Sequence, residues 1–335
     1  MTYQIAALLL TPFLCRASAL VINDTPTVNA RAVTNTSKAG LPWPNGNADD
    51  INQYLSTGKV QWYYTWSPSP TQADLEFVPM LWGTNQVDQW DGTINKTVQD
   101  LHVTHVLGFN EPEIQGQSNI DPQEGAALWK AHIEPLRGLG VQLGSPAPSG
   151  SPAGKQWLLD FMDACQGGCS VDFIAVHYYD INSTGFMEYL EDYHNTFQRS
   201  MWVTEWACQN FNNADMQCSQ QDVVDFMNST QAFMDSTDWV ERYGWFGAME
   251  NLQGVNEANA LMSSQGSITP LGQQYIGATV PQVDANYTPG VVHGGSGLPS
   301  GDGGSNAALL FGHTTPWQTL LLPAMVTCAM MRFAV

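Results

Sequence analysis

Eight short apolar runs, separated by longer amphipathic stretches, constrain the fold of this chain more than any other feature of its sequence. The runs lie at residues 39–43, 60–66, 77–82, 105–110, 142–145, 173–179, 201–206 and 243–249. Most of them are continuously apolar, which is typical of parallel strands buried on both faces. Helix-like segments follow most runs, at residues 49–55, 87–100, 122–139, 156–164, 186–198 and 220–237, whereas residues 70–75 are poorly helical.

Eight strand-and-helix units over roughly 240 residues predict an α/β fold, a single (β/α)8 TIM barrel spanning residues 39–280. The alternative is a doubly wound open sheet. A nucleotide-binding version of that sheet is disfavoured, because no G-x-G-x-x-G follows the first run and the sequence has no P-loop. In a barrel, functional side chains lie at the C-terminal ends of the strands.

The charge balance limits the partners of this chain. It has 11 Lys and Arg against 31 Asp and Glu, for a net charge of −20, and 43% of its residues are hydrophobic. This composition excludes a disordered chain and argues against binding to nucleic acid or to anionic lipid surfaces. A neutral partner, such as a carbohydrate or a small molecule, fits better. We expect a monomer that needs no cofactor.

Both ends of the sequence read as segments outside the barrel. An apolar run at residues 5–14, followed by Ala17-Ser18-Ala19, predicts a secretory signal peptide over residues 1–19. A buried N-terminal helix is the alternative. Residues 20–38 are expected to form a linker, and residues 281–306 a second linker rich in Gly, Ser and Pro.

The last segment, residues 307–335, is a hydrophobic tail preceded by small residues. That order predicts a GPI-anchor signal and a location at the cell surface or cell wall, attached through a glycolipid. Arg332 and Pro323 are unfavourable in such a tail. A disordered or weakly membrane-associated tail therefore stays open as the alternative.

Sequons and cysteines agree with secretion. Six Asn-x-Ser/Thr sequons, each expected on an exposed turn if glycosylated, start at Asn23, Asn35, Asn95, Asn182, Asn228 and Asn286. Outside the two ends, four cysteines remain, and local pairing predicts the disulfides Cys165–Cys169 and Cys208–Cys218. A zinc site is the alternative, but an oxidising compartment favours disulfides.

Two glutamates lie at the ends of apolar runs. Glu111 lies in the segment HVLGFNEPE, where Pro112 is expected to hold it in an extended conformation. Glu205 lies in the segment MWVTEWA. One proton donor and one nucleophile or base across a barrel mouth are what glycoside hydrolysis requires. Salt-bridged or solvated strand-end residues are the alternative. We expect no metal site, because the seven His residues lack H-x3-H and HExxH spacing.

Several motifs occur in order at the expected strand ends: GLPWPN, WYYTWS, FVPMLWG, GFNEPE, GSPAPS, FIAVHYYD, WVTEWA and YGWFGAM. Over the whole expected barrel the chain thereby resembles glycoside hydrolase family 128, the fungal alkali-sensitive-linkage-like endo-β-1,3-glucanases. The resemblance implies a retaining enzyme that hydrolyses β-1,3-glucan. It also implies that Glu111 is the acid/base, that Glu205 is the nucleophile, and that Asn110 binds the hydroxyl beside the reacting carbon.

Other strand-end residues are candidates for substrate binding. Trp66, Trp82, Trp206 and Trp245 could contact sugar rings, although a tryptophan in an apolar strand is as often part of the core. His177 could orient a catalytic carboxylate or bind sugar. Tyr179 could donate a hydrogen bond to the nucleophile. Surface or structural roles are expected for the acids Glu113 and Glu250.

Two other functions remain open from the sequence. One is a barrel that binds glucan without turning it over, as a wall-anchoring or sensing protein. The other is a retaining glycanase that acts on a different β-linked polysaccharide. The presence of both glutamates counts against the first.

Overall fold

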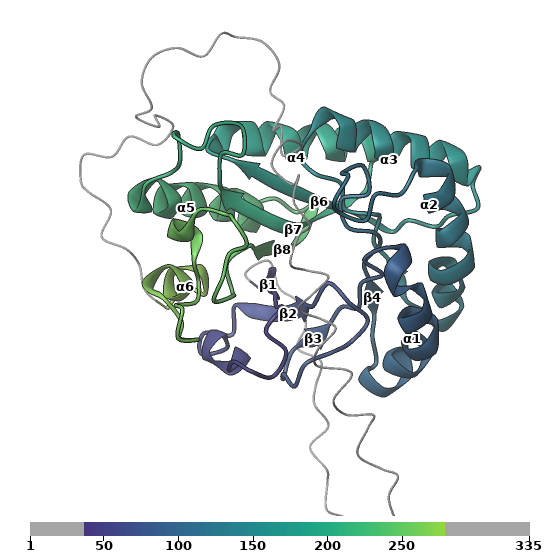
Figure 1. Cartoon of the computed structure of the whole chain (residues 1–335), viewed down its shortest axis with the longest axis horizontal. Coiled ribbons are helices and arrows are strands. Elements are labelled where there is room, and N and C mark those ends of the chain that lie inside the picture. The colour runs from purple at the N-terminus through teal and green to yellow at the C-terminus, as the bar shows by residue number, and fades with distance from the viewer. Residues whose placement is uncertain (1–36, 279–335) are drawn as a thin grey trace, which may run out of the picture. The chain divides into compact units, whose positions relative to one another are not determined.

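The computed structural model describes residues 37–278 of the chain (Figure 1). The predicted signal peptide, most of the first linker, the second linker and the tail lie outside the described residues, as do the sequons at Asn23, Asn35 and Asn286. In the described part, no helix has the length and apolar character needed to span a membrane.

Parallel strands form the centre of the fold. A six-stranded sheet has the order β3-β2-β1-β8-β7-β6, and β4 pairs with β5 in a second sheet. Two isolated parallel bridges, Met80–Leu107 and Gly144–Phe173, connect the facing edges of these two sheets. The strands are β1 Ala39–Pro42, β2 Val60–Tyr64, β3 Glu76–Phe77, β4 His105–Val106, β5 Gln142–Leu143, β6 Phe173–Asp180, β7 Ser200–Cys208 and β8 Val240–Trp245.

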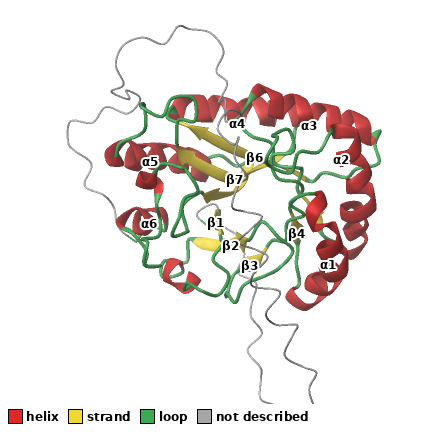
Figure 2. Ribbon diagram, in the orientation of Figure 1, coloured by secondary structure: helices red, strands yellow, loops and turns green. Residues whose placement is uncertain are grey.

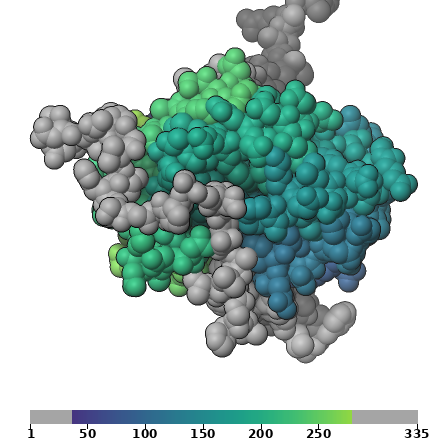
Figure 3. All heavy atoms as spheres, turned by 90° about the horizontal axis from the view of Figure 1, so that it is seen from above, coloured from purple at the N-terminus to yellow at the C-terminus, as the bar shows by residue number. Residues whose placement is uncertain are grey.

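Helices cover the outside of these strands (Figure 2). They are α1 Val87–Leu101, α2 Pro122–Leu128, α3 Pro152–Cys165, α4 Ser183–Phe197, α5 Gln220–Ser236 and α6 Pro270–Tyr275. The middle of the described chain, coloured teal, occupies much of the face seen from above (Figure 3). The α/β fold with parallel strands is therefore as predicted.

Two predicted helices differ from the structure. The segment 122–139 is not one helix: α2 continues as a π turn over Trp129–Ile133 and then as a 3-10 helix over Glu134–Leu139. Pro135 explains the change, because it has no N–H to donate along the helix. After β1 the chain forms only a short 3-10 helix, Ile51–Tyr54.

Local sequence signals set the helix boundaries. The Ser151 side chain caps α3, where Pro152 takes the first helical position. Ser219 and Asp222 form a capping box at the start of α5.

The cysteine prediction holds and the sequon prediction holds in part. The structure contains the disulfides Cys165–Cys169 and Cys208–Cys218. Asn182 lies on an exposed turn, where it caps α4. Asn95 and Asn228 lie within α1 and α5 instead of on turns, because the helical pattern continues through both sequons.

A buried ion cluster fills the interior near the strand starts. Arg242 of β8 is 5% exposed, and its Nη2 lies 2.7 Å from Glu76 Oε2. The guanidinium carbon lies 4.3 Å from the centroid of the Trp202 ring. His105 Nδ1 lies 2.9 Å from Glu76 Oε1. Burial opposes ionisation of Glu76, but the hydrogen bonds and charges of His105 and Arg242 outweigh burial and lower its pKa to about 2.

The lowered pKa of Glu76 predicts a loss of stability in acid. Its ionised form stabilises the fold above the ordinary pKa of 4.5, and this stabilisation disappears as pH falls towards about 2. We expect the wild type to lose about 1–2 kcal/mol of this contribution between pH 6 and pH 3. Denaturant unfolding at both pH values measures it.

The comparison with Glu76→Gln isolates the effect. The difference in unfolding free energy between wild type and this variant should shrink as pH falls. Glu191→Gln, on the exposed face of α4, is the control and should show no such convergence. A difference that stays constant with pH would contradict the assignment.

Candidate active site

A cavity of about 600 Å³, including its open mouth, lies where strands β2, β4, β6, β7 and β8 end. Its lining is mostly aromatic and polar, and consists of Trp66, Trp82, Asn110, Glu111, Gln117, Tyr179, Glu205, Phe211, Phe246, Gln253 and Val255. The position agrees with the expectation that a barrel carries its functional groups at the strand ends.

Glu111 occupies a tight turn after β4. Its φ is +38°, in the left-handed region, so the predicted extended conformation is wrong. The turn is fixed from both sides: the Glu111 N–H donates to the Ala147 carbonyl at 2.8 Å, and the Glu111 carbonyl accepts from Ile114 N–H at 3.0 Å. Pro112 favours an extended conformation at the residue before it, and these two hydrogen bonds hold Glu111 in the turn against that preference. Strained backbone of this kind concentrates at functional sites.

Glu205 lies in β7, and both of its carboxylate oxygens accept hydrogen bonds. Trp66 Nε1 donates to Oε1 at 2.8 Å, and the Tyr64 hydroxyl shares its proton between the Thr204 carbonyl at 3.1 Å and the same carboxylate oxygen at 3.3 Å. The Tyr179 hydroxyl donates to Oε2 at 2.5 Å. Burial and the nearby Glu205 charge raise the pKa of Tyr64 and of Tyr179 well above the ordinary value, so both phenols keep their protons and remain donors.

A β-bulge aims Glu205 at this cavity. The pairing of β7 with β8 shifts register between Val203 and Trp206. Trp202 packs on Trp62 with ring centroids 5.2 Å apart, and Trp62 in turn stacks on Tyr64, which reaches Glu205. Trp202 and Glu205 therefore share the inner face although they are three residues apart, which a regular strand does not allow.

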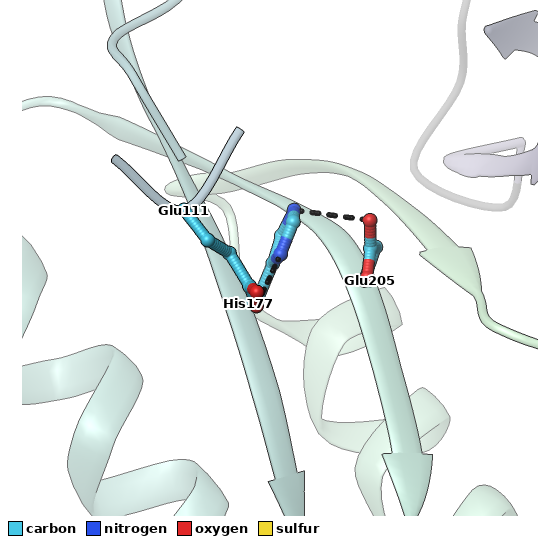
Figure 4. Close-up of side chains that lie close together, drawn as sticks. All are labelled: Glu111, His177 and Glu205. Atoms are coloured by element: carbon cyan, nitrogen blue, oxygen red, sulfur yellow. Dashed lines mark hydrogen bonds and ion pairs between the residues drawn. The ribbon is translucent and has the colours of Figure 1, made fainter. Parts of the chain in front are cut away.

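His177 lies between the two glutamates (Figure 4). Its Nδ1 is 3.0 Å from Glu111 Oε1, its Nε2 is 3.4 Å from Glu205 Oε1, and its side chain is fully buried. Burial favours the neutral ring, but Glu205 and Glu111 outweigh burial and raise the pKa of His177. Burial, reinforced by the charge of Glu205, raises the pKa of Glu111 although His177 opposes the shift.

The three residues have donor types that also occur in metal sites. One ligand atom from each of Glu111, His177 and Glu205 lies within 4.8 Å of the others. Glu205, however, already accepts hydrogen bonds from two tyrosines and a tryptophan. A metal ion would have to compete with these donors for the same oxygens. We therefore interpret the cluster as two carboxylates joined by a histidine.

Asn110 precedes Glu111 and lines the cavity. Its Nδ2 donates to Gln117 Oε1 at 3.2 Å. Its Oδ1 is buried and has no hydrogen-bond partner within the described part of the chain. A ligand hydroxyl is the kind of group that would satisfy it.

The structure separates the predicted aromatic candidates into two groups. Trp66, Trp82 and Tyr179 line the cavity. Trp206 and Trp245 do not, and their assignment to substrate binding is wrong. Both are fully buried on the opposite face of the strands, where Trp206 donates to Thr230 Oγ1 of α5 and Trp245 donates to the Asn259 carbonyl.

The remaining predicted candidates lie around the glutamates or away from them. His177 is enclosed, so the structure supports its role in orienting the carboxylates and not in binding sugar. Glu113 accepts from the Ser149 N–H at 2.8 Å behind the site, and burial raises its pKa. Glu250 is exposed. Neither acid lines the cavity, which agrees with the surface or structural roles expected for them.

Several residues of the site were not predicted. Tyr64 and Phe246 lie within the expected runs 60–66 and 243–249, so the strand-end rule could have identified both. Gln117, Phe211, Gln253 and Val255 lie on loops whose sequences carry no periodic signal.

Comparison with known proteins places this site in a family context. Residues 40–275 match the family model described as glycosyl hydrolase catalytic core. Alkali-sensitive linkage protein 1 of Schizosaccharomyces pombe is 34% identical over 246 residues, which are 72% of this chain and 44% of that relative. The chain thus spans less than half the length of this relative.

Two similar solved structures are β-1,3-glucanases of glycoside hydrolase family 128. An exo-β-1,3-glucanase from Cryptococcus neoformans is 32% identical with a TM-score of 0.63, covering 71% of this chain and 98% of its own. An endo-β-1,3-glucanase variant from Amycolatopsis mediterranei, in complex with laminarihexaose, is 27% identical with a TM-score of 0.60. It covers 72% of this chain and 100% of its own.

The two groups of tryptophans should differ in their effect on stability. Trp206→Ala removes a fully buried ring and should lower the free energy of unfolding by about 3–5 kcal/mol. Trp82→Ala removes a half-buried ring from the cavity lining and should cost about 1 kcal/mol. Urea unfolding of both variants measures the difference. Equal losses would show that Trp82 is a core residue.

Proposed function

The chain belongs to the glycosyl hydrolase catalytic core family, and on that premise we propose that it hydrolyses β-1,3-glucan with retention of configuration. The observation that carries the proposal is the short separation of the glutamates, whose nearest side-chain oxygens lie within 4.8 Å. The close approach of these oxygens supports retention, in which the carboxyl groups as a whole lie about 5–5.5 Å apart, over inversion, in which they lie about 6.5–9.5 Å apart to admit a water. Both carboxyl groups also line the same open cavity.

The environments of the two carboxyl groups suit different roles. Glu205 accepts hydrogen bonds on both carboxylate oxygens, and these hold the group in place for the role of nucleophile. Glu111 has a raised pKa because it is buried, which suits a general acid. His177 contacts both carboxyl groups and holds them at a fixed separation.

The reaction then follows in two steps. Glu111 gives its proton to the glycosidic oxygen as that bond breaks, while Glu205 bonds to the anomeric carbon. In the second step Glu111 takes a proton from water, the water oxygen attacks the anomeric carbon, and Glu205 leaves as a carboxylate. Asn110 Oδ1 accepts from the hydroxyl beside the reacting carbon, while Trp66 and Trp82 provide aromatic surfaces for sugar rings.

We also propose that the parallel strands close into a complete (β/α)8 barrel. The bridges Met80–Leu107 and Gly144–Phe173 support this, because they connect the segments between the edge strands of the two sheets. The barrel would extend over the predicted domain, residues 39–280.

The cellular setting is likewise a proposal that rests on sequence motifs. The signal-like residues 1–19 and the six sequons support a secreted glycoprotein. The tail 307–335 supports attachment to the cell surface or wall through a glycolipid. We further propose that the protein cuts within the chain, as an endoglucanase. The two similar enzymes named above include one exo and one endo enzyme, so product sizes decide this point.

Hydrolysis of laminarin tests the reaction and its stereochemistry together. We expect the secreted protein to release reducing ends from laminarin, and proton NMR to show the β-anomer first because two displacements retain configuration. Oligosaccharides of several lengths at early times would support endo cutting. Initial release of the α-anomer would overturn the retaining mechanism, and binding without release would indicate a glucan-binding protein.

Variants of the two glutamates separate their roles. Glu205→Ala should lower kcat on laminarin by at least about a thousandfold, because it removes the nucleophile. Glu111→Ala should lower it by about 10²–10⁴-fold. With an aryl β-glucoside that has a good leaving group, azide should restore turnover to Glu111→Ala, because azide attacks the intermediate without a base.

The exposed Glu250→Ala is the matched control and should change kcat less than about twofold. If azide rescued Glu205→Ala by forming the β-azide and did not rescue Glu111→Ala, the two roles would be misassigned.

A further inference from the structure

A loop closed by a disulfide borders the cavity at the end of β7. Cys208 is the last residue of β7, and its bond to Cys218 closes residues 209–217 into a ring, here called the Cys208–Cys218 loop. Residues 212–216 of this loop are exposed. Phe211 is its one aromatic residue, and it lines the cavity.

Phe211 packs directly against the catalytic constellation. Its ring meets the Tyr179 ring edge-on with centroids 5.3 Å apart, and Tyr179 donates to Glu205. Phe246 contacts the same tyrosine from β8 at 5.8 Å. The half-buried Phe211 ring therefore continues an aromatic wall that runs from Trp66 through Phe246 and Tyr179.

Amide side chains fix the loop to the segment that follows β8. Gln217 Nε2 donates to the Asn210 carbonyl at 2.6 Å within the loop. The Asn256 N–H donates to Gln209 Oε1 at 2.6 Å, and Asn256 Nδ2 donates to the Cys218 carbonyl at 2.8 Å. Asn256 directly follows Val255, which lines the cavity beside Phe211. The disulfide thus lies at the junction of two cavity walls.

We propose that Phe211 binds a glucosyl residue of the substrate and that the Cys208–Cys218 disulfide is the device that holds it in place. This inference rests on the proposed function. The exposed, polar loop has little apolar surface of its own to fix its conformation. The covalent closure, the amide hydrogen bonds and the contact with Tyr179 therefore determine together where Phe211 lies. A ring face is suited to stack on the C–H face of a glucose ring.

Two kinds of variant distinguish the effect of the Phe211 ring from the effect of the closed loop. Phe211→Ala removes the ring and leaves the disulfide, whereas Cys208→Ser with Cys218→Ser opens the loop and keeps the ring. If the disulfide acts through Phe211, the two changes are not additive. The second disulfide, Cys165–Cys169, precedes β6 at the opposite end of the strands and is the matched control.

The test measures laminarihexaose binding by calorimetry in the full protein carrying Glu205→Gln, which prevents turnover. We expect Phe211→Ala to raise Kd about tenfold and the Cys208/Cys218 double serine variant to raise it about fivefold to tenfold. The combination should be no weaker than Phe211→Ala alone. Phe211→Tyr and the Cys165/Cys169 double serine variant should stay within about twofold.

Amide hydrogen exchange gives a readout that needs no substrate. Residues 209–217 should exchange faster in the Cys208/Cys218 variant while the protection of β6 and β7 is retained, which shows that the fold is intact. Additive effects on Kd, or an unchanged Kd in Phe211→Ala with a wild-type site that binds laminarihexaose, would overturn this inference and leave the glucanase assignment intact. A protein that bound no laminarihexaose would overturn both.

Discussion

The burial of two carboxyl groups beside one histidine is the constraint on which the rest of the site depends. An ionised carboxylate in an apolar barrel mouth is costly unless donors surround it. The sequence supplies these donors from separate strand ends, with Tyr64 and Trp66 around β2 and Tyr179 at the end of β6. His177 lies between the two acids, so their separation follows from the parallel neighbours β6 and β7 and from the turn after β4.

The two ends of the strands divide stability and function between them. Near the strand starts, Arg242, Glu76 and His105 form a compact ion cluster beneath the interior aromatic rings. At the strand ends, Glu111 and Trp66 adopt left-handed backbone conformations, which non-glycine residues adopt at some energetic cost. Such local strain persists only where the surrounding structure fixes the residue, and the buried strand layer below provides that support.

How far the sequence predicts this site depends on whether a residue lies on a strand. The long continuous runs placed β6 and β7 well, and with them His177, Tyr179 and Glu205. Trp206 was misassigned although the two-residue period carried the answer, since neighbours in a strand point to opposite faces and Glu205 points inwards. The bulge before Glu205 cannot be recognised in the sequence, because it depends on how β7 pairs with β8.

The loop residues show where such prediction ends for a physical reason. Phe211 lies in a loop that is held by the Cys208–Cys218 disulfide and by Asn256 after β8, and its ring packs on Tyr179 from β6. No periodic pattern in the sequence encodes these contacts. Strand register and a bulge fix Glu205, and the turn after β4 fixes Glu111. The cavity walls around Phe211 and Val255 are fixed by contacts between loops. Chains with the same strand ends can therefore share the two carboxyl groups and still differ in the shape of the cavity beside them.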